Sequence, residues 1–180
     1  MNANIGETIT TMTRCVCEAA VEVFACYGVI VRPVNAASHA AVSLEPASVR
    51  AVIGYDGSGV RGALVVMAPR SAVKCWALQA RFAEEIGVHE IVAELANIIM
   101  GRLKGRLLLE GFPLLMWTAT PSSGMPTHLV EAQRASALAN LVGPGGHFAM
   151  RLDAMFDKSF ALLPYAARHS APAAGEVLFL

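Results

Sequence analysis

Hydrophobic residues recur every three or four positions in two long segments, and this spacing marks one face of an α-helix. The first segment runs from Ile5 to Tyr27, and Gly28 follows at the position where a glycine commonly ends a helix. The second runs from about Val88 to Leu109, and Gly111 follows it. The pattern therefore predicts two long amphipathic helices, each ended by a glycine.

Between these helices, alternating apolar positions predict a β-hairpin. Its strands are residues 49–55 and 60–67, and the turn is Asp56-Gly57-Ser58-Gly59, which is rich in residues that adopt positive φ. Gly62 lies inside the second strand, where a glycine indicates a bulge or a close approach of another group.

The remaining elements are shorter. A helix is expected from Ala72 to about Phe82 with Ser71 as its N-cap. A strand is expected from Leu114 to Thr120, because Pro121 would end it. Residues expected to be extended or in loops are 29–33, 35–46 and 122–128.

The C-terminal part combines an ambiguous segment with a clear turn. Alanines in residues 135–142 favour a helix, whereas the position of the segment suits a strand. Gly143-Pro144-Gly145-Gly146 predicts a turn, and residues 147–152 alternate like a strand. We expect one domain over residues 1–153 and a loosely docked Ala/Pro-rich tail over residues 154–180. No internal repeat is visible, and the order of elements predicts an α+β fold, a mostly antiparallel sheet with long helices on one side.

Composition excludes several classes of protein. Fourteen Lys and Arg residues balance fourteen Asp and Glu residues, which argues against a nucleic-acid-binding protein. A hydrophobic content of 55% argues against a disordered chain. The most apolar stretch, residues 98–117, contains four charged residues, so no membrane span is expected. The start of the chain does not resemble a secretory signal and the four cysteines suit a reducing compartment, so a cytoplasmic protein is expected.

The second long helix carries a narrow polar stripe. At about 100° per residue, five of its residues fall within an arc of about 80°. These residues are Glu90, Glu94, Asn97, Gly101 and Lys104. Asn97 and Gly101 are unfavourable inside a helix, Gly101 by about 1 kcal/mol relative to alanine, so their place on one face indicates that something docks there. Arg102 and Arg106 fall inside the apolar arc, and the sequence gives no account of them beyond aliphatic stems lying at its edge.

These residues resemble a known family. Glu94-Leu95-Ala96-Asn97, with Glu90 four residues earlier, Gly101 four residues later and a distant Pro121, is similar to the motif of the CheC/CheX/FliY phosphatases. The glycine-rich hairpin over residues 52–64 also resembles that family, and the resemblance extends from the first helix to about Leu152.

Family members with two active sites carry a second Glu-x-x-Asn motif in the first helix. In this chain the glutamates Glu18 and Glu22 are followed by Val21 and Ala25 where the asparagine would stand. The chain therefore resembles single-motif CheX, and a homodimer is expected from this resemblance.

The resemblance implies hydrolysis of the aspartyl phosphate of a CheY-like response regulator, which supplies Mg²⁺, the phosphoryl group and a lysine. Asn97 would position the attacking water, and Glu94 would pair with the lysine of the regulator. Glu90, Gly101 and Lys104 would take part in docking. The chain itself is expected to bind no cofactor, metal ion or nucleic acid, and not to associate with a membrane.

Two alternatives remain open at this point. The same fold and stripe serve equally in a non-catalytic module that only holds a response regulator or pairs subunits. A stand-alone scaffold would instead leave residues 88–109 facing solvent. The five histidines lack the short spacings of a zinc site, and His89-Glu90-Ile91-Val92-Ala93 has alanine where a metalloprotease helix needs its second histidine.

Overall fold

The computed structural model describes residues 3–34, 48–57, 59–82, 86–110, 112, 114–116, 120–121 and 133–157. Its helices are α1 (Ala3–Cys26), α2 (Arg70–Gln79) and α3 (Val88–Leu109). Its strands are β1 (Arg32–Val34), β2 (Ser48–Gly57), β3 (Val60–Pro69), β4 (Leu115–Met116), β5 (Thr120–Pro121), β6 (Gln133–Gly143) and β7 (Gly146–Phe156). Helices and strands occur in one mixed chain, as the α+β prediction requires.

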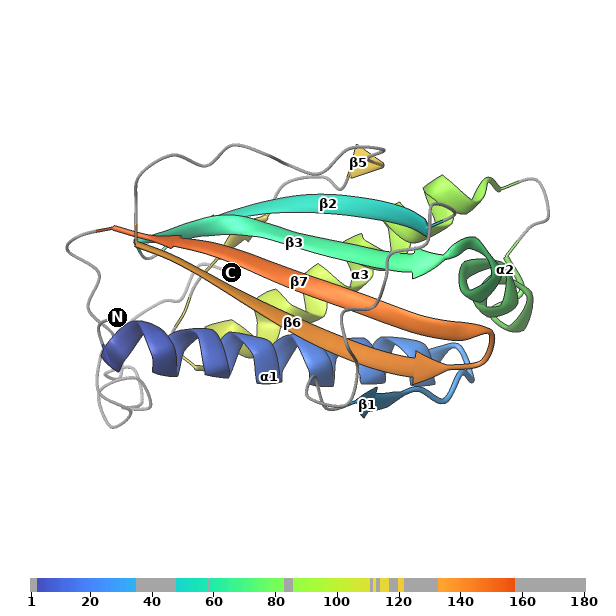
Figure 1. Cartoon of the computed structure of the whole chain (residues 1–180), viewed down its shortest axis with the longest axis horizontal. Helices are drawn as coiled ribbons and strands as arrows, with labels where there is room; N and C mark the ends of the chain where they lie inside the picture. Colours follow the sequence, from blue (N-terminus) through green and yellow to red (C-terminus); the bar gives the residue numbers. More distant parts are fainter. Residues whose placement is uncertain are drawn as a thin grey trace, which may run out of the picture.

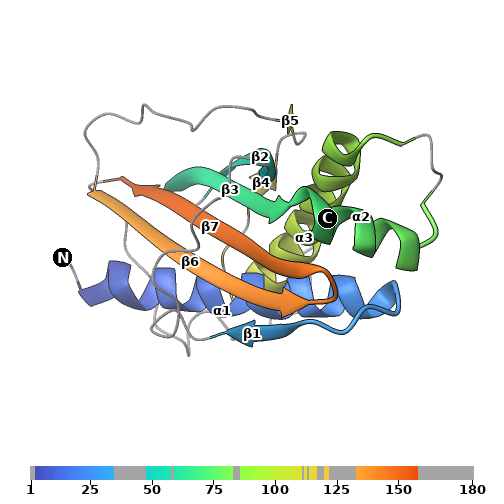
Figure 2. The ribbon, with the colours of Figure 1, turned by 45° about the vertical axis from the view of Figure 1, so that its right-hand side comes forward.

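The strands of the described part form one seven-stranded sheet in which every pairing is antiparallel. The strand order is β1-β6-β7-β3-β2-β4, and β5 pairs with β2. Helices α1 and α3 lie side by side on one face of the sheet, α1 mainly under β6 and α3 mainly under β2 (Figures 1 and 2). Helix α2 lies at the end of the sheet and connects β3 to α3. The predicted antiparallel sheet with its long helices on one side is confirmed.

The chain follows the same path twice. Helix α1, the short strand β1 and the hairpin β2–β3 are followed by helix α3, the short strand β4 and the hairpin β6–β7. Each half gives its short strand to the hairpin of the other half, because β1 pairs with β6 and β4 pairs with β2. The sequence shows no repeat, but the structure has one.

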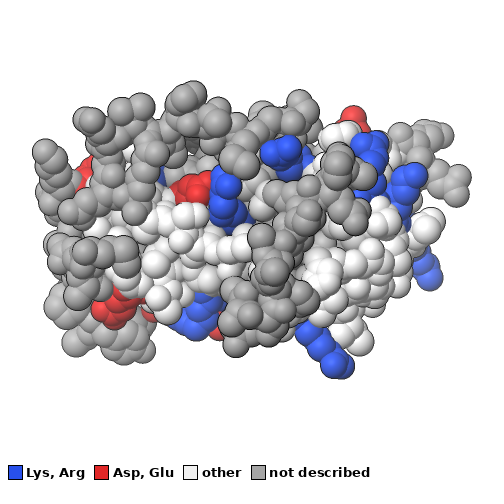
Figure 3. Space-filling model, viewed as in Figure 1, with Lys and Arg blue, Asp and Glu red and all other residues white. Residues whose placement is uncertain are grey.

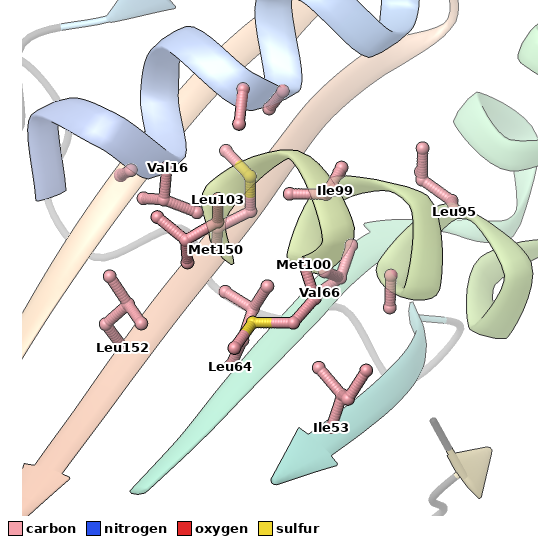
Figure 4. Close-up of a cluster of buried hydrophobic side chains, with 14 of the residues drawn as sticks. Val16, Ile53, Leu64, Val66, Leu95, Ile99, Met100, Leu103, Met150 and Leu152 are labelled. Carbon is pink, nitrogen blue, oxygen red and sulfur yellow. The ribbon is translucent and has the colours of Figure 1, made fainter. Parts of the chain in front are cut away.

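The core lies between the sheet and the two long helices. Ile53 of β2 and the alternate residues Leu64 and Val66 of β3 lie in one buried cluster. The same cluster contains Leu95, Ile99 and Leu103 of α3 (Figure 4). Leu95, Ile99 and Leu103 are fully buried. The apolar face of α3 is therefore fixed against the sheet, which determines the face that it shows to solvent.

The end of α1 agrees with the sequence, and the bounds of α2 do not. Gly28 has a φ of +72°, and the Val29 N–H donates to the Phe24 carbonyl at 2.9 Å, so α1 closes as expected. Helix α2 begins at Arg70 directly after Pro69, so Ser71 lies inside the helix and is not its N-cap. The helix ends at Gln79 and not at Phe82, because the backbone turns at Arg81, with a φ of +56°.

Three strand predictions also change. The strand expected over residues 114–120 is present as β4 and β5, and β5 includes Pro121. The ambiguous segment 135–142 is a strand, part of β6. Strand β7 continues past residue 153 to Phe156, so residues 154–156 belong to the sheet. Residues 158–180 of the expected tail, and the loops expected at 35–46 and 122–128, lie outside the described residues.

Gly62 marks a close approach, one of the two alternatives considered. It pairs in register with Tyr55 on one side and with Ala154 on the other, so β3 continues through it without a bulge. A Cβ at Gly62 would overlap the Asp153 carbonyl oxygen and come within 2.7 Å of the Tyr55 hydroxyl. The Tyr55 hydroxyl donates to that same carbonyl oxygen at 3.1 Å.

Candidate functional site

The polar stripe of α3 faces outward. Glu90, Glu94, Gly101 and Lys104 are exposed and Asn97 is half-buried. Buried residues of the same helix alternate with this stripe, among them Ile91, Leu95, Ala96, Ile99 and Met100. The structure thus brings all five predicted site residues onto one solvent-facing surface of one helix.

Glu94 and Asn97 form the centre of this surface. They are three positions apart in the chain, which is about 4.5 Å along the helix axis. Glu94 has no hydrogen bond or ion pair with any residue in the described ranges. A carboxylate in this state is available to an incoming cation, and the carboxamide of Asn97 supplies both a donor and an acceptor beside it.

Glu90 has a structural position at the start of the helix. Gly87 is the N-cap of α3, and a Cβ at Gly87 would overlap the Glu90 carboxylate. The side chain of Glu90 therefore folds back over the first turn, where a negative charge is favourable next to the free backbone N–H groups. The Glu90 carboxylate therefore lies against the start of the helix, whereas the Glu94 side chain is exposed to solvent.

Two glycines leave the exposed face of α3 bare. A Cβ at Gly101 or at Gly105 would meet no atom within 4 Å. Neither glycine is required by a tight contact within the chain, although each destabilises the helix by about 1 kcal/mol relative to alanine. The space above Gly101 is directly next to Asn97, one helical turn away.

The partners of Arg102 and Arg106 lie on α1 and are not apparent from the sequence. Helices α1 and α3 run antiparallel, and charged residues at four-residue steps on the two helices face one another in a continuous chain that we call the α1–α3 ion ladder. Its ion pairs are Arg14–Glu110 (2.8 Å), Arg14–Glu18 (3.3 Å), Arg106–Glu18 (2.8 Å), Arg106–Glu22 (3.0 Å) and Arg102–Glu22 (3.2 Å). The sequence does show glutamates four residues apart in the first helix and arginines four residues apart in the second long helix. This pattern predicts ion pairs only once the two helices are known to pack together.

Two of the four cysteines are poor nucleophiles. Burial raises the pKa of the Cys15 and Cys17 thiols above their usual range, which disfavours the nucleophilic thiolate. All four cysteines are free thiols. Among the described residues no group of three metal-ligating side chains comes together.

Charge is scattered over the face of the molecule seen in Figure 3. On the sheet face seen in Figure 3, the described Lys and Arg side chains are interspersed with Asp and Glu side chains, and they do not merge into one large basic area. None of the helices in the described ranges has the length and the apolar character needed to cross a bilayer.

The arrangement of layers, the exchanged short strands and the outward-facing polar helix define a fold that is found among chemotaxis proteins. The chain has the fold of the CheX and CheC-like proteins over most of its length. CheX from Vibrio vulnificus superposes with a TM-score of 0.63 at 15% identity, covering 79% of this chain and 95% of that one. CheX from Desulfovibrio desulfuricans gives 0.60 at 16% identity, covering 81% and 99%.

A further match is CheX in a complex with CheY, BeF3 and Mg²⁺ from Borrelia burgdorferi, with a TM-score of 0.56 at 16% identity, covering 79% of this chain and 96% of that one. The fold is shared more distantly with the FliM middle domain of Vibrio alginolyticus, at 9% identity, 81% and 92% coverage and a TM-score of 0.51. No protein-family model and no curated protein matches the sequence.

Proposed function

We propose that this protein hydrolyses the aspartyl phosphate of a CheY-like response regulator and so ends its signal. The observation that carries this proposal is the outward-facing pair Glu94 and Asn97 on α3, next to the bare Gly101, in a chain with the CheX fold. The crystallised complex of a CheX with CheY, BeF3 and Mg²⁺ supports the choice of partner.

Asn97 would act on the water. Its carboxamide oxygen accepts a hydrogen bond from the water and its NH₂ group donates to a phosphoryl oxygen, which holds the water in line with the bond that breaks. The water oxygen attacks phosphorus, the bond from phosphorus to the aspartate oxygen breaks, and the carboxylate and inorganic phosphate leave. Mg²⁺ bound in the regulator would neutralise charge on the phosphoryl oxygens. The chain itself needs no cofactor for this reaction.

Glu94 would hold the regulator. An exposed carboxylate without an internal partner can form a charge-assisted pair with a lysine beside the phosphorylated aspartate. Gly101 would leave room for a loop of the regulator, and Glu90 and Lys104 would extend the contact along α3. Catalysis and docking would thus share one helical face.

The test is phosphate release from phosphorylated CheY-like receiver domains of the organism that encodes this chain. Each domain is followed with and without the protein at the same Mg²⁺ concentration. At least one domain should lose phosphate about 100-fold faster, the effect expected of a well-placed nucleophile. Unchanged decay across the whole set would refute the proposal.

A non-catalytic docking module is the second candidate, and the likeness to the FliM middle domain is the observation that favours it. It would bind a phosphorylated regulator without shortening the lifetime of the phosphate. Binding and hydrolysis measured on the same receiver domain separate the two candidates. Under either function we propose that the chain works as a homodimer in the cytoplasm.

A further inference from the structure

We propose that Arg102 is a second docking residue, which exchanges Glu22 for an acidic side chain on the response regulator. The inference rests on the proposed function and names a contact that it does not include. Its structural basis is the position of Arg102 at the end of the α1–α3 ion ladder that lies nearest to Asn97.

Arg102 can leave the ladder without exposing a buried charge. Among the described residues its one partner is the Glu22 carboxylate at 3.2 Å, and its side chain is 54% exposed. Glu22 has a second partner, because its other oxygen accepts from Arg106 at 3.0 Å. When Arg102 turns away, Glu22 stays paired and Arg106 keeps both of its carboxylates. The exchange therefore leaves the rest of the ladder intact.

Along the helix axis, Arg102 lies within the radius of a typical contact area centred on Asn97, and the far end of the ladder lies outside it. A typical interface buries about 800 Å² on each partner, equivalent to a disc of about 16 Å radius. Arg102 lies five residues beyond Asn97, or about 7.5 Å along the helix, whereas Glu110 lies about 20 Å beyond it. Arg14 pairs with Glu110 and so shares its distant position.

Charge makes the exchange favourable. Glu90 and Glu94 make the N-terminal part of the exposed face of α3 negative, and Lys104 makes its C-terminal part positive. Arg102 adds a positive charge at the edge of this face, next to α1. A receiver domain that holds Mg²⁺ and a phosphorylated aspartate needs further carboxylates as metal ligands, so its active-site rim is acidic. Glu94 would meet the lysine of that site and Arg102 an acidic residue on its rim, which fixes one orientation of the regulator along α3.

Three variants test this, with the receiver domain that the protein dephosphorylates fastest, loaded with BeF3 and Mg²⁺, as the binding probe. Arg102→Met should weaken binding about threefold to fivefold, the range of one exposed ion pair, and reduce the salt dependence of binding. Arg14→Met is the matched control, because Arg14 is 52% exposed and also belongs to the ladder. It should leave binding unchanged. The hydrolysis rate of Arg14→Met at saturating protein should also equal that of the wild type, because Arg14 pairs with Glu110 at the end of the ladder that lies far from Asn97.

Glu22→Gln distinguishes docking from a purely structural role. Removing the charge of Glu22 frees Arg102, so binding should become as tight as in the wild type or tighter. If Arg102 only held α1 against α3, the same change would loosen the helix pair and weaken binding, and that result overturns the inference.

Equal effects of Arg102→Met and Arg14→Met on binding also overturn it. If Arg102→Met binds normally while the wild type hydrolyses the phosphate, the inference fails and the proposed function stands. If no receiver domain is bound or dephosphorylated, both fail.

Discussion

The hydroxyl of Tyr55 lies over Gly62, in the space that a side chain on Gly62 would need. Tyr55 reaches from β2 across β3 and donates to the Asp153 carbonyl oxygen of β7 at 3.1 Å. A Cβ at Gly62 would be 2.7 Å from the Tyr55 hydroxyl. One buried side chain thus connects three strands at the centre of the sheet, and the missing side chain of Gly62 makes this possible.

Replacement of Gly62 by alanine should therefore destabilise the protein. The added methyl group would displace Tyr55 and push β7 away, and overpacking of this kind costs about 1–3 kcal/mol. Chemical denaturation gives the free energy of unfolding. The control is Gly101→Ala, which adds the same methyl group to a helix surface with open space and should stabilise by up to about 1 kcal/mol. A Gly62→Ala variant as stable as the wild type would show that the contact is loose.

Tyr55 should make stability fall at alkaline pH. Burial raises the pKa of Tyr55 well above its usual range, so the folded protein keeps the phenol proton after the unfolded chain has begun to release it near pH 10. The contribution of Tyr55 to the free energy of unfolding is fully present below pH 10. Above pH 10 it falls by about 1.4 kcal/mol per pH unit. Tyr55→Phe should cost about 1 kcal/mol at pH 7 by losing the hydrogen bond. Its stability should approach and then exceed that of the wild type above pH 10. Parallel stability curves between pH 8 and 11 would contradict this.

Replacing Asn97 should slow hydrolysis, whereas replacing Glu94 should also weaken binding of the regulator. Asn97→Ala and the isosteric Asn97→Asp should both slow phosphate release by about 100-fold while binding of the BeF3-loaded regulator persists, because a carboxylate cannot donate to the phosphoryl group. Glu94→Ala should also weaken binding. Single-turnover hydrolysis and binding titrations separate these effects. Gln79→Ala, which removes an exposed amide from α2, is the control. Full activity of Asn97→Ala would rule out the mechanism.

A bulky side chain at Gly101 should block the regulator. Gly101→Gln would fill the open space next to Asn97 and should lower binding at least tenfold, while the folded state becomes slightly more stable. Gly105→Gln is the matched control, because Gly105 has the same open surroundings one turn further from Asn97 and should be affected less. A Gly101→Gln variant that binds normally would place the contact elsewhere.

The sequence was informative where structure depends on neighbours along the chain. The bounds of α3, the close of α1 at Gly28 and the β2–β3 hairpin follow from periodicity and turn residues, and all three are confirmed. The outward direction of Glu94 and Asn97 follows from the same periodicity. Local rules were less reliable at Ser71, because the helix could begin earlier, directly after Pro69.

The features that the sequence did not reveal depend on distant segments. Residues 135–142 form a strand despite their alanines, because they pair along their whole length with β7. Arg102 and Arg106 looked misplaced on an apolar arc, because their partners Glu18 and Glu22 lie on α1, eighty or more residues earlier. The twofold path of the chain was hidden for the same reason, since the two halves share their topology and not their residues.

Because β1 and β4 each pair with the hairpin of the other half, neither half can form its part of the sheet alone. A break between β3 and α2 would separate each short strand from its partner. One fragment would hold β1 without β6, and the other would hold β4 without β2. Such fragments should recover the native structure only when mixed. The interlocking of the two halves therefore keeps the sheet indivisible, while the outer side of α3 takes no part in it.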